Sequence, residues 1–152
     1  MNSIKRRQFI KQVARATASV SALSALSADR VIGANDRVQV ALIGCGGRGR
    51  LVSNLMRQAP NTDFIAVCDV NEPSAAAAKQ WAGTTAKSFG DFRRVLELKE
   101  VDAVLVATPD HWHAIPTVLA CQAGKDVYVE RPLGLTIRQG RTMIEAARRS
   151  NR

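Results

Sequence analysis

The chain has 152 residues and a mass of 16.5 kDa, with 46% apolar side chains, 23% charged side chains and a mean hydropathy of −0.09. This composition is typical of a globular protein and excludes a disordered, collagen-like or coiled-coil chain, and the length fits one domain with or without a targeting segment. The formal net charge of +9 raises the question of nucleic-acid binding, so the location of the charge matters.

The positive charge is concentrated at the N-terminus. Residues 1–37 carry seven basic and two acidic side chains, whereas residues 38–152 carry fifteen basic and eleven acidic ones. The second part has no run of Lys and Arg interleaved with aromatic residues, and it matches no nucleic-acid-binding motif. We therefore expect no nucleic-acid partner.

Residues 1–34 have the order of an export signal. Residues 5–11 read KRRQFIK, and a run of small and apolar residues follows from 16 to 28. This run is shorter than the roughly 20 residues needed to span a bilayer, but it fits the apolar region of a signal peptide. The Arg-Arg-x-Phe-Ile-Lys pattern resembles a twin-arginine signal. We expect export to the periplasm, with the membrane involved only through the signal. The alternative is an amphipathic N-terminal helix on a cytoplasmic protein.

From residue 35 onward, strand-like and helix-like segments alternate. Four apolar runs predict strands: residues 38–43, 64–68, 101–107 and 127–129. A short further strand is an option near residues 86–88. Helical spacing or helix-terminal residues predict five helices: residues 48–58, 73–81, 91–98, 114–123 and 136–149. This alternation indicates βαβ units, so we expect residues 35–152 to form an α/β domain with a doubly wound, mostly parallel sheet, which is a Rossmann fold.

A glycine-rich turn follows the first predicted strand and opens the first predicted helix: Gly44-Cys45-Gly46-Gly47-Arg48-Gly49. In this pattern Gly44 permits the tight turn, Gly46 leaves room for a pyrophosphate, and Gly49 lets helix and strand pack closely. The free N–H groups and partial positive charge at the start of a helix favour phosphates. The turn therefore predicts a dinucleotide site that includes Gly47 and Arg48.

Asp69 follows the second predicted strand, twenty residues after Gly49. A carboxylate there can accept hydrogen bonds from both hydroxyls of an adenosine ribose and would repel a 2′-phosphate, so we expect NAD, with NADP left open. Two alternatives remain. Asp69 could cap a helix or stabilise a turn, and S-adenosylmethionine methyltransferases also combine a glycine-rich turn with an acid at a strand end.

Two later strand ends carry further motifs, Ala107-Thr108-Pro109 with a following His113, and the run from Asp126 to Pro132. Together with the glycine-rich turn and Cys68-Asp69, they give residues 37–149 a resemblance to the glucose–fructose oxidoreductase/inositol dehydrogenase (Gfo/Idh/MocA) family. The resemblance implies a nicotinamide-dependent oxidoreductase that acts on a sugar or polyol. It is also compatible with a full-length enzyme that forms a homo-oligomer. Exported members with twin-arginine signals are common in that family.

The resemblance also implies roles for single residues. Thr108 and Pro109 would pass beside the nicotinamide half of the cofactor. Glu130, Arg131 and Pro132 would match the family's Glu-Lys-Pro, whose Pro is often cis and whose Lys faces nicotinamide and substrate. Because Arg stays charged, Arg131 could orient a hydroxyl or the cofactor but is a poor proton relay.

The histidines and cysteines give no metal pattern. His111 and His113 are two residues apart, which does not place two ligands on one helical face, and both helix-start hydrogen bonding and a pocket-lining role for His113 stay open. Trp112 between them could form a pocket wall or belong to the core. The three cysteines have no zinc or redox spacing and are expected to be buried thiols, with a Cys45–Cys68 bond as the alternative.

In the family, a larger α/β domain follows the cofactor domain and supplies most of the substrate pocket and the catalytic base. This sequence stops at Arg152, so the resemblance implies a chain truncated before that domain, and none of its residues is assigned as the base. A non-catalytic NAD-binding fragment is the alternative to a working oxidoreductase.

Overall fold

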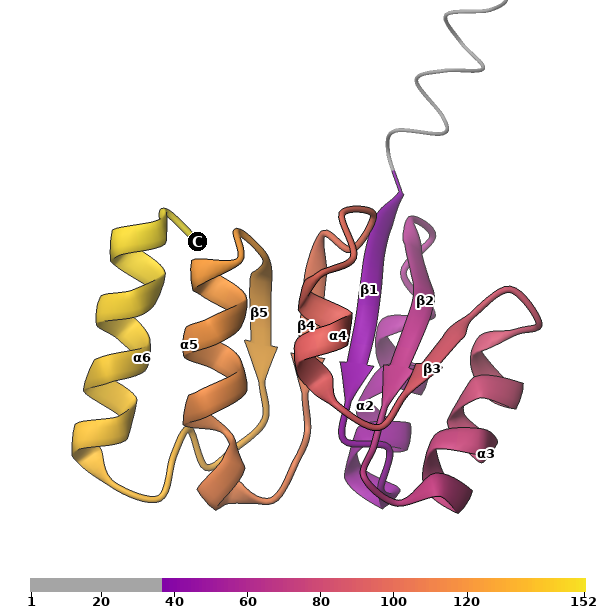
Figure 1. Cartoon of the computed structure of the whole chain (residues 1–152), viewed down its shortest axis with the longest axis horizontal. Helices are drawn as coiled ribbons and strands as arrows, with labels where there is room; N and C mark the ends of the chain where they lie inside the picture. The colour runs from indigo at the N-terminus through magenta and orange to yellow at the C-terminus, as the bar shows by residue number, and fades with distance from the viewer. Residues whose placement is uncertain (1–36) are drawn as a thin grey trace, which may run out of the picture. The chain divides into compact units, whose positions relative to one another are not determined.

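The computed structural model describes residues 37–152, and the predicted export signal lies outside the described residues. This part forms five strands, five α-helices and a short 3-10 helix, shown in Figure 1: β1 (Val38–Ile43), α2 (Gly47–Met56), β2 (Thr62–Cys68), α3 (Glu72–Ala82), β3 (Lys87–Phe89), α4 (Phe92–Leu96), β4 (Ala103–Val106), η1 (Asp110–Trp112), α5 (Ala114–Gln122), β5 (Asp126–Val129) and α6 (Ile137–Ser150).

The strands form one parallel sheet in the order β3-β2-β1-β4-β5. The chain builds outward from β1 to β3, crosses back to place β4 on the other side of β1, and then adds β5. Ile43 pairs with both Cys68 and Val106, so β1, β2 and β4 end at the same level. The predicted doubly wound parallel sheet is confirmed, and the residues that follow these three strands meet at one edge of the sheet.

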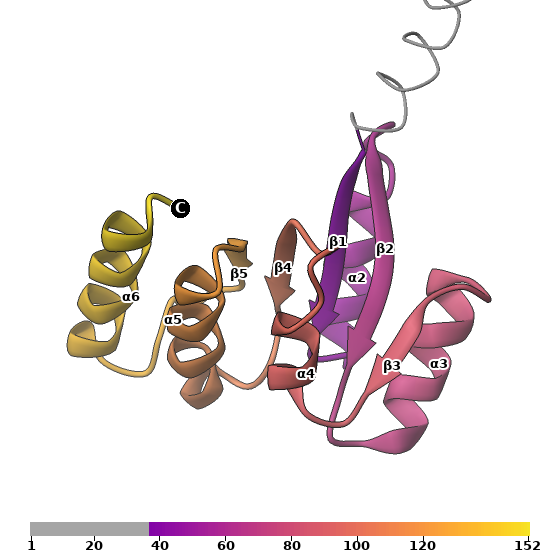
Figure 2. The same ribbon diagram turned by 45° about the horizontal axis from the view of Figure 1, so that its top comes forward.

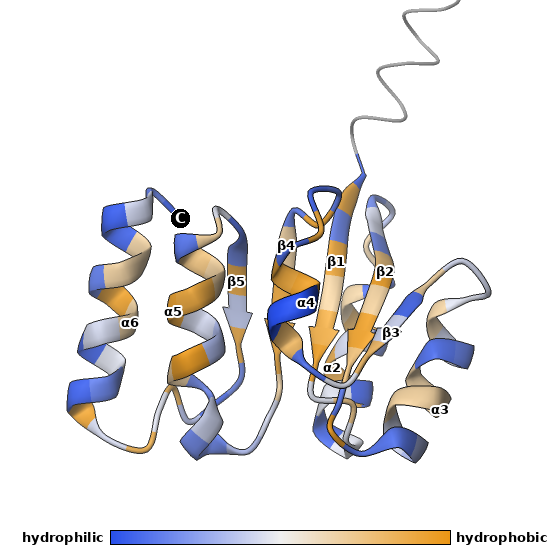
Figure 3. Ribbon diagram, in the orientation of Figure 1, coloured by the Kyte–Doolittle hydropathy of each residue, from blue (hydrophilic) through white to orange (hydrophobic). Residues whose placement is uncertain are grey.

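Helices cover both faces of the sheet, with α4 and α2 on opposite sides of β1 in Figures 1 and 2. Val40 and Leu42 pack with residues of α2 and α3, while Ala41 and Ile43 pack with residues of α4 and α5. Because these strands are covered on both faces, their residues are mostly apolar, and Figure 3 shows β1 and β4 as hydrophobic along most of their length. Strands buried on both faces read as continuous apolar runs, which is the pattern that predicted them.

Element boundaries differ from the predictions where apolar residues lie in turns. The fourth strand starts at Ala103 because the N–H of Val101 donates to the carbonyl of Leu98, which closes a turn after α4. The optional short strand is present as β3, and η1 was not predicted. Helix α6 begins with a capping box of Thr136 and Gln139 and packs against α5. None of the helices within residues 37–152 combines the length and the hydrophobicity that a membrane-spanning helix requires.

Candidate cofactor-binding site

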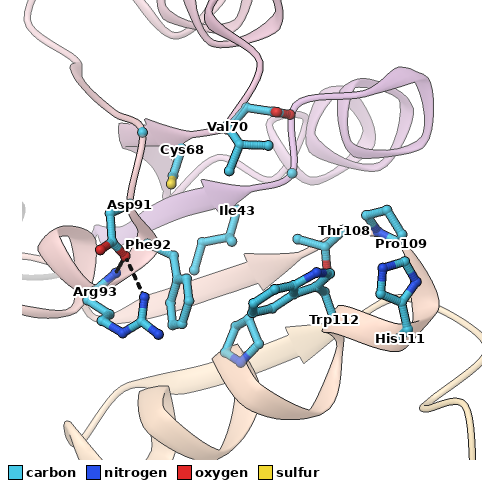
Figure 4. A pocket seen from close by; sticks show the side chains of 14 residues that line it. Ile43, Cys68, Val70, Asp91, Phe92, Arg93, Thr108, Pro109, His111 and Trp112 are labelled. Atoms are coloured by element: carbon cyan, nitrogen blue, oxygen red, sulfur yellow. Dashed lines mark hydrogen bonds and ion pairs between the residues drawn. The ribbon is translucent and has the colours of Figure 1, made fainter.

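A cavity of about 490 Å³ opens at the carboxyl ends of β1, β2 and β4. Gly44, Asp69 and Thr108, which lie just after these three strands, all line it. Figure 4 shows the side chains of Val70, Phe92 and Trp112 around the same space. The position is the point where strand order reverses, which is where doubly wound sheets bind their ligands, and the volume lies in the usual range of small-molecule sites.

The glycines of the turn after β1 have distinct surroundings. Gly44 has a φ of +95°, and a Cβ there would come within 2.6 Å of the Ala107 backbone. A Cβ on Gly49 would overlap the carbonyl oxygen of Gly44, so helix α2 can approach the turn only with glycine at this position. A Cβ on Gly46 or Gly47 would meet no atom within 4 Å. Space for a ligand is therefore left at the start of α2.

The first turn of α2 is suited to an anion. Gly46 is the N-cap residue, no side chain caps the helix, and no acidic side chain lies in its first turn. Its first N–H groups therefore have no side-chain acceptor, and the helix dipole adds a partial positive charge there. This is the arrangement that binds pyrophosphate in dinucleotide sites.

Asp69 lies against the glycine-rich turn. Its Oδ2 accepts a hydrogen bond from the Cys45 N–H at 2.7 Å, and its Oδ1 accepts from the Asn71 N–H at 2.8 Å. Helix α3 is capped by the side chain of Asn71, which accepts from the Ser74 N–H at 3.0 Å. The helix-cap alternative for Asp69 is therefore wrong, although its bond to Asn71 does stabilise the local turn.

Thr108 and Pro109 form part of the cavity wall. The Thr108 hydroxyl oxygen is buried and has no hydrogen-bond partner within residues 37–152. A buried hydroxyl without a partner is costly, so a ligand that bonds to it would be favoured. Trp112, which is 43% exposed, lines the cavity beside Thr108 in Figure 4, so it is a pocket wall and not a core residue.

The structure does not bring the His113 ring to the cavity surface. The residue is 2% exposed, and both ring nitrogens contact backbone carbonyls, Nδ1 that of Pro132 and Nε2 that of Thr108, each at 2.7 Å. The ring lies behind two loops of the site, which corrects the pocket-lining interpretation. His111 lines the cavity instead, and its ring is exposed beside Asp110.

The end of β5 is tied to the glycine-rich turn. Glu130 is 5% exposed, and its Oε1 accepts a hydrogen bond from Arg48 at 3.1 Å while its Oε2 accepts from the Arg131 N–H at 3.0 Å. The hydrogen bond from Arg48 lowers the pKa of Glu130 below its ordinary value and raises that of Arg48. The Arg131–Pro132 peptide bond is cis. These residues and Arg48 line a second hollow of about 480 Å³.

The cysteines near the site are free thiols, so the disulfide alternative is wrong. The Cys45 thiol donates to the carbonyl of Cys68 at a distance of 3.4 Å. Burial, with a smaller effect of the nearby Asp69, raises the pKa of both thiols to about 12. Among residues 37–152, no three His, Cys, Asp or Glu side chains are grouped as a metal site requires.

Sequence reasoning did not find the wall that β3 and α4 contribute. Asp91, Phe92 and Arg93 line the cavity, and Arg93 contacts Asp91 at 3.1 Å. Val70, directly after Asp69, also lines it. A usable signal was present, because Asp91 follows a strand end in a parallel sheet, but that strand is only three residues long.

The fold and this cavity define a dinucleotide-binding domain of the Rossmann type. Residues 38–152 match the family described as an oxidoreductase family with an NAD-binding Rossmann fold, GFO_IDH_MocA. The chain belongs to this family, and the matched part is its NAD-binding domain. Membership in an oxidoreductase family overturns the methyltransferase alternative.

The chain is also similar to curated proteins with two different names. The chain is 30% identical over 116 residues to inositol 2-dehydrogenase from Klebsiella pneumoniae, covering 76% of this chain and 34% of the relative. It is 32% identical over 147 residues to a glycosyl hydrolase family 109 protein from Stenotrophomonas maltophilia, covering 90% and 32%. The chain thus spans about a third of the length of these relatives.

Solved structures give the same fold. The WlbA dehydrogenase from Chromobacterium violaceum, in complex with NADH and UDP-GlcNAcA, aligns with a TM-score of 0.69 at 26% identity, covering 77% of this chain and 34% of that one. An NAD-binding oxidoreductase from Klebsiella pneumoniae aligns with a TM-score of 0.69 at 32% identity, covering 76% and 33%.

Proposed function

We propose that this chain provides the cofactor-binding part of an NAD-dependent oxidoreductase that acts on a sugar, a polyol or a related small molecule. One observation carries the proposal: Gly44 at the start of the glycine-rich turn, Asp69 and Thr108 line a single cavity at the reversal of strand order. The relatives support the substrate class, since they include an inositol 2-dehydrogenase and a dehydrogenase crystallised with a nucleotide-linked sugar acid.

The described residues fit NAD. The uncapped start of α2 and the open space beside Gly46 would hold the pyrophosphate, and Asp69 would bind the adenosine ribose. The unpartnered hydroxyl of Thr108 offers a hydrogen bond to the other half of the cofactor. When bound, the nicotinamide ring supplies the group that accepts or gives a hydride.

The residues at the end of β5 would orient the reacting groups. Glu130 accepts hydrogen bonds from the Arg131 N–H and from the Arg48 side chain. These two bonds fix the loop that carries the exposed residue Arg131. Because guanidinium keeps its charge, Arg131 would position a hydroxyl or a carbonyl and would not transfer a proton. No described residue is assigned as the catalytic base.

Asp69 gives the test of cofactor choice. We expect the protein to bind NADH at least about tenfold more tightly than NADPH, because a carboxylate facing a 2′-phosphate is repulsive. Asp69→Asn removes that repulsion and one acceptor for the ribose hydroxyls. It should therefore weaken the binding of NADH and reduce the difference in affinity between NADH and NADPH. NADH fluorescence titration measures both. Equal affinity of the parent for NADH and NADPH would contradict the preference for NAD. Absence of binding of either cofactor by the folded protein would contradict the proposed function.

We also propose export by the twin-arginine route to the periplasm. The paired Arg6 and Arg7, the following Phe9 and Lys11, and the short apolar run support it. This route carries folded proteins, so a cofactor made in the cytoplasm could be bound before export. Replacing Arg6 and Arg7 with Lys should keep the protein in the cytoplasm, as cell fractionation would show. Unchanged export of the Lys-Lys variant would contradict this assignment, and cytoplasmic parent protein would favour the alternative.

A further inference from the structure

We propose that His113 is a positioning residue that fixes the two loops on the nicotinamide side of the cofactor site relative to each other. The inference rests on the proposed function. Its ring is almost completely buried and contacts one carbonyl from each loop, Thr108 after β4 and Pro132 after β5, at 2.7 Å in both cases. Pro132 is nineteen residues after His113 in sequence and Thr108 is five residues before it, so one side chain joins two segments that are distant in sequence.

The strand order decides which half of a dinucleotide these loops would meet. Asp69 after β2 and the glycine-rich turn after β1 account for the adenosine and the pyrophosphate. The remaining nucleoside must then extend over β4 and β5, which lie on the other side of β1. Thr108 lines the first cavity, and Pro132 lines the second hollow beside Arg131. The His113 ring thus joins the walls of both spaces.

His113 is itself fixed to the start of α5. Its N–H donates to the carbonyl of Asp110 at 3.2 Å, and its own carbonyl accepts from the Thr117 hydroxyl at 2.8 Å. The backbone of His113 is therefore fixed to a helix that packs on the sheet. Its ring contacts both loops and so restricts where they can lie. Carbonyl oxygens only accept hydrogen bonds, so the ring is the donor in any hydrogen bond that it makes with these loops.

A positioning role and a purely structural role of His113 predict different effects on ligand binding, because only a positioning role is confined to one half of the cofactor. NADH reaches the loops over β4 and β5, whereas ADP carries only the adenosine and the pyrophosphate. Loss of the His113 contacts should therefore raise the Kd of NADH about tenfold and change the Kd of ADP less than about twofold. A structural defect would weaken both ligands together, because it would disturb the whole sheet edge.

Two substitutions retain a single donor each. In His113→Asn the amide nitrogen lies near the position of Nδ1 and can reach Pro132, and in His113→Gln it lies near the position of Nε2 and can reach Thr108. Both should bind NADH more weakly than the parent and more tightly than His113→Phe, which keeps a ring without donors. Graded loss across the three variants would show that the hydrogen bonds, and not the ring volume alone, set the affinity.

Lys125 provides a matched control at the opposite end of the strands. It is also buried, and its Nζ donates to two backbone carbonyls, those of Leu98 and Val101, each at 2.7 Å. Lys125→Met should lower the thermal stability by removing these bonds but leave the Kd of NADH and of ADP unchanged. Comparing the Lys125 and His113 variants shows whether weaker NADH binding follows from losing any buried side chain that contacts two carbonyls, or only from losing His113.

A measurement on the parent protein does not depend on how the variants fold. The chain has two histidines, so ¹⁵N labelling of histidine gives spectra in which the ring signals of His113 can be assigned. Saturating NADH should shift these signals, and ADP should leave them in place. The inference is overturned if NADH leaves them unchanged, or if the His113 variants bind NADH like the parent or lose NADH and ADP equally. A parent that binds neither ligand would instead refute the proposed function.

Discussion

At the scale of single residues, the glycines of the turn after β1 are required for different reasons. A Cβ at position 49 would overlap a backbone oxygen, whereas one at position 46 would enter open space. Gly49→Ala should therefore destabilise the fold by about 1–3 kcal/mol through overpacking. Gly46→Ala should cost about 1 kcal/mol or less, as for an N-cap change, yet weaken NADH at least about tenfold. Urea unfolding and NADH titration measure the two effects, and a Gly46→Ala protein with parental affinity would contradict the assigned pyrophosphate position.

The buried thiols give a second prediction at this scale. Because burial raises the pKa of Cys45 and Cys68 to about 12, the reactive thiolate is scarce at pH 8. Iodoacetamide should alkylate both at least about a hundredfold more slowly in folded protein than in urea, as mass spectrometry of timed samples would show. Rapid labelling of either residue in the folded protein would mean that the end of its strand is open to solvent.

Backbone features in the sequence were enough to predict that Gly44, Asp69 and Thr108 follow neighbouring strands and meet at one edge of the sheet. The turn glycines and Asp69 could be recognised because a turn and a strand end place them, whatever the neighbouring side chains do. The contacts of His113 and the cavity wall from Phe92 could not be recognised, because they depend on how segments distant in sequence pack. The unpartnered hydroxyl of Thr108 is likewise visible only in three dimensions.

At the scale of elements, the ion pair of Arg48 and Glu130 joins the start of α2 to the end of β5. Its hydrogen bond lowers the pKa of Glu130 in the folded protein. A lowered carboxyl pKa stabilises the folded state above the unfolded value, near 4.3, and that stabilisation is lost as the pH falls through the folded value. The parent should thus lose more stability between pH 5.5 and pH 3 than Glu130→Gln does.

Urea unfolding at a series of pH values measures this difference. Glu145→Gln is the matched control, because Glu145 pairs with Arg149 at 3.5 Å on the exposed side of α6 and such pairs contribute little. Its pH dependence should follow that of the parent. Parallel curves for the parent and Glu130→Gln would show that the link between α2 and β5 does not stabilise the fold.

The elements themselves were largely predictable because helices cover both faces of the sheet. Burial on both faces makes β1, β2 and β4 read as apolar runs that stand out from the amphipathic helices. The same signal fails for short elements. β3 has three residues, of which two are exposed, and η1 has a single turn, so neither carries a full period of any pattern.

At the scale of the whole molecule, the described part has a core on each face of its sheet, and the cavity is built from elements of both cores. Unfolding should therefore destroy the cavity, so a ligand bound there should stabilise the folded state. A ligand at a concentration of 100 times its Kd stabilises the native state by about 2.7 kcal/mol. For a domain of this size that corresponds to a rise in Tm of roughly 10 °C or more. Scanning calorimetry with and without NADH tests this, with Gly46→Ala as the control that should show a smaller rise. An unchanged Tm of the parent would count against a cofactor site in this domain.

If NAD binds in the cavity at the carboxyl ends of β1, β2 and β4, it should change the environment of the backbone amides around that cavity. The most direct test is a titration of ¹⁵N-labelled protein with NAD, followed by the backbone amide signals. The amides of Gly46, Gly47, Asp69 and Thr108 should shift most, and those of helix α6 should remain in place. Signals that do not move at saturating NAD, or that move mainly on α6, would show that NAD does not bind in this cavity.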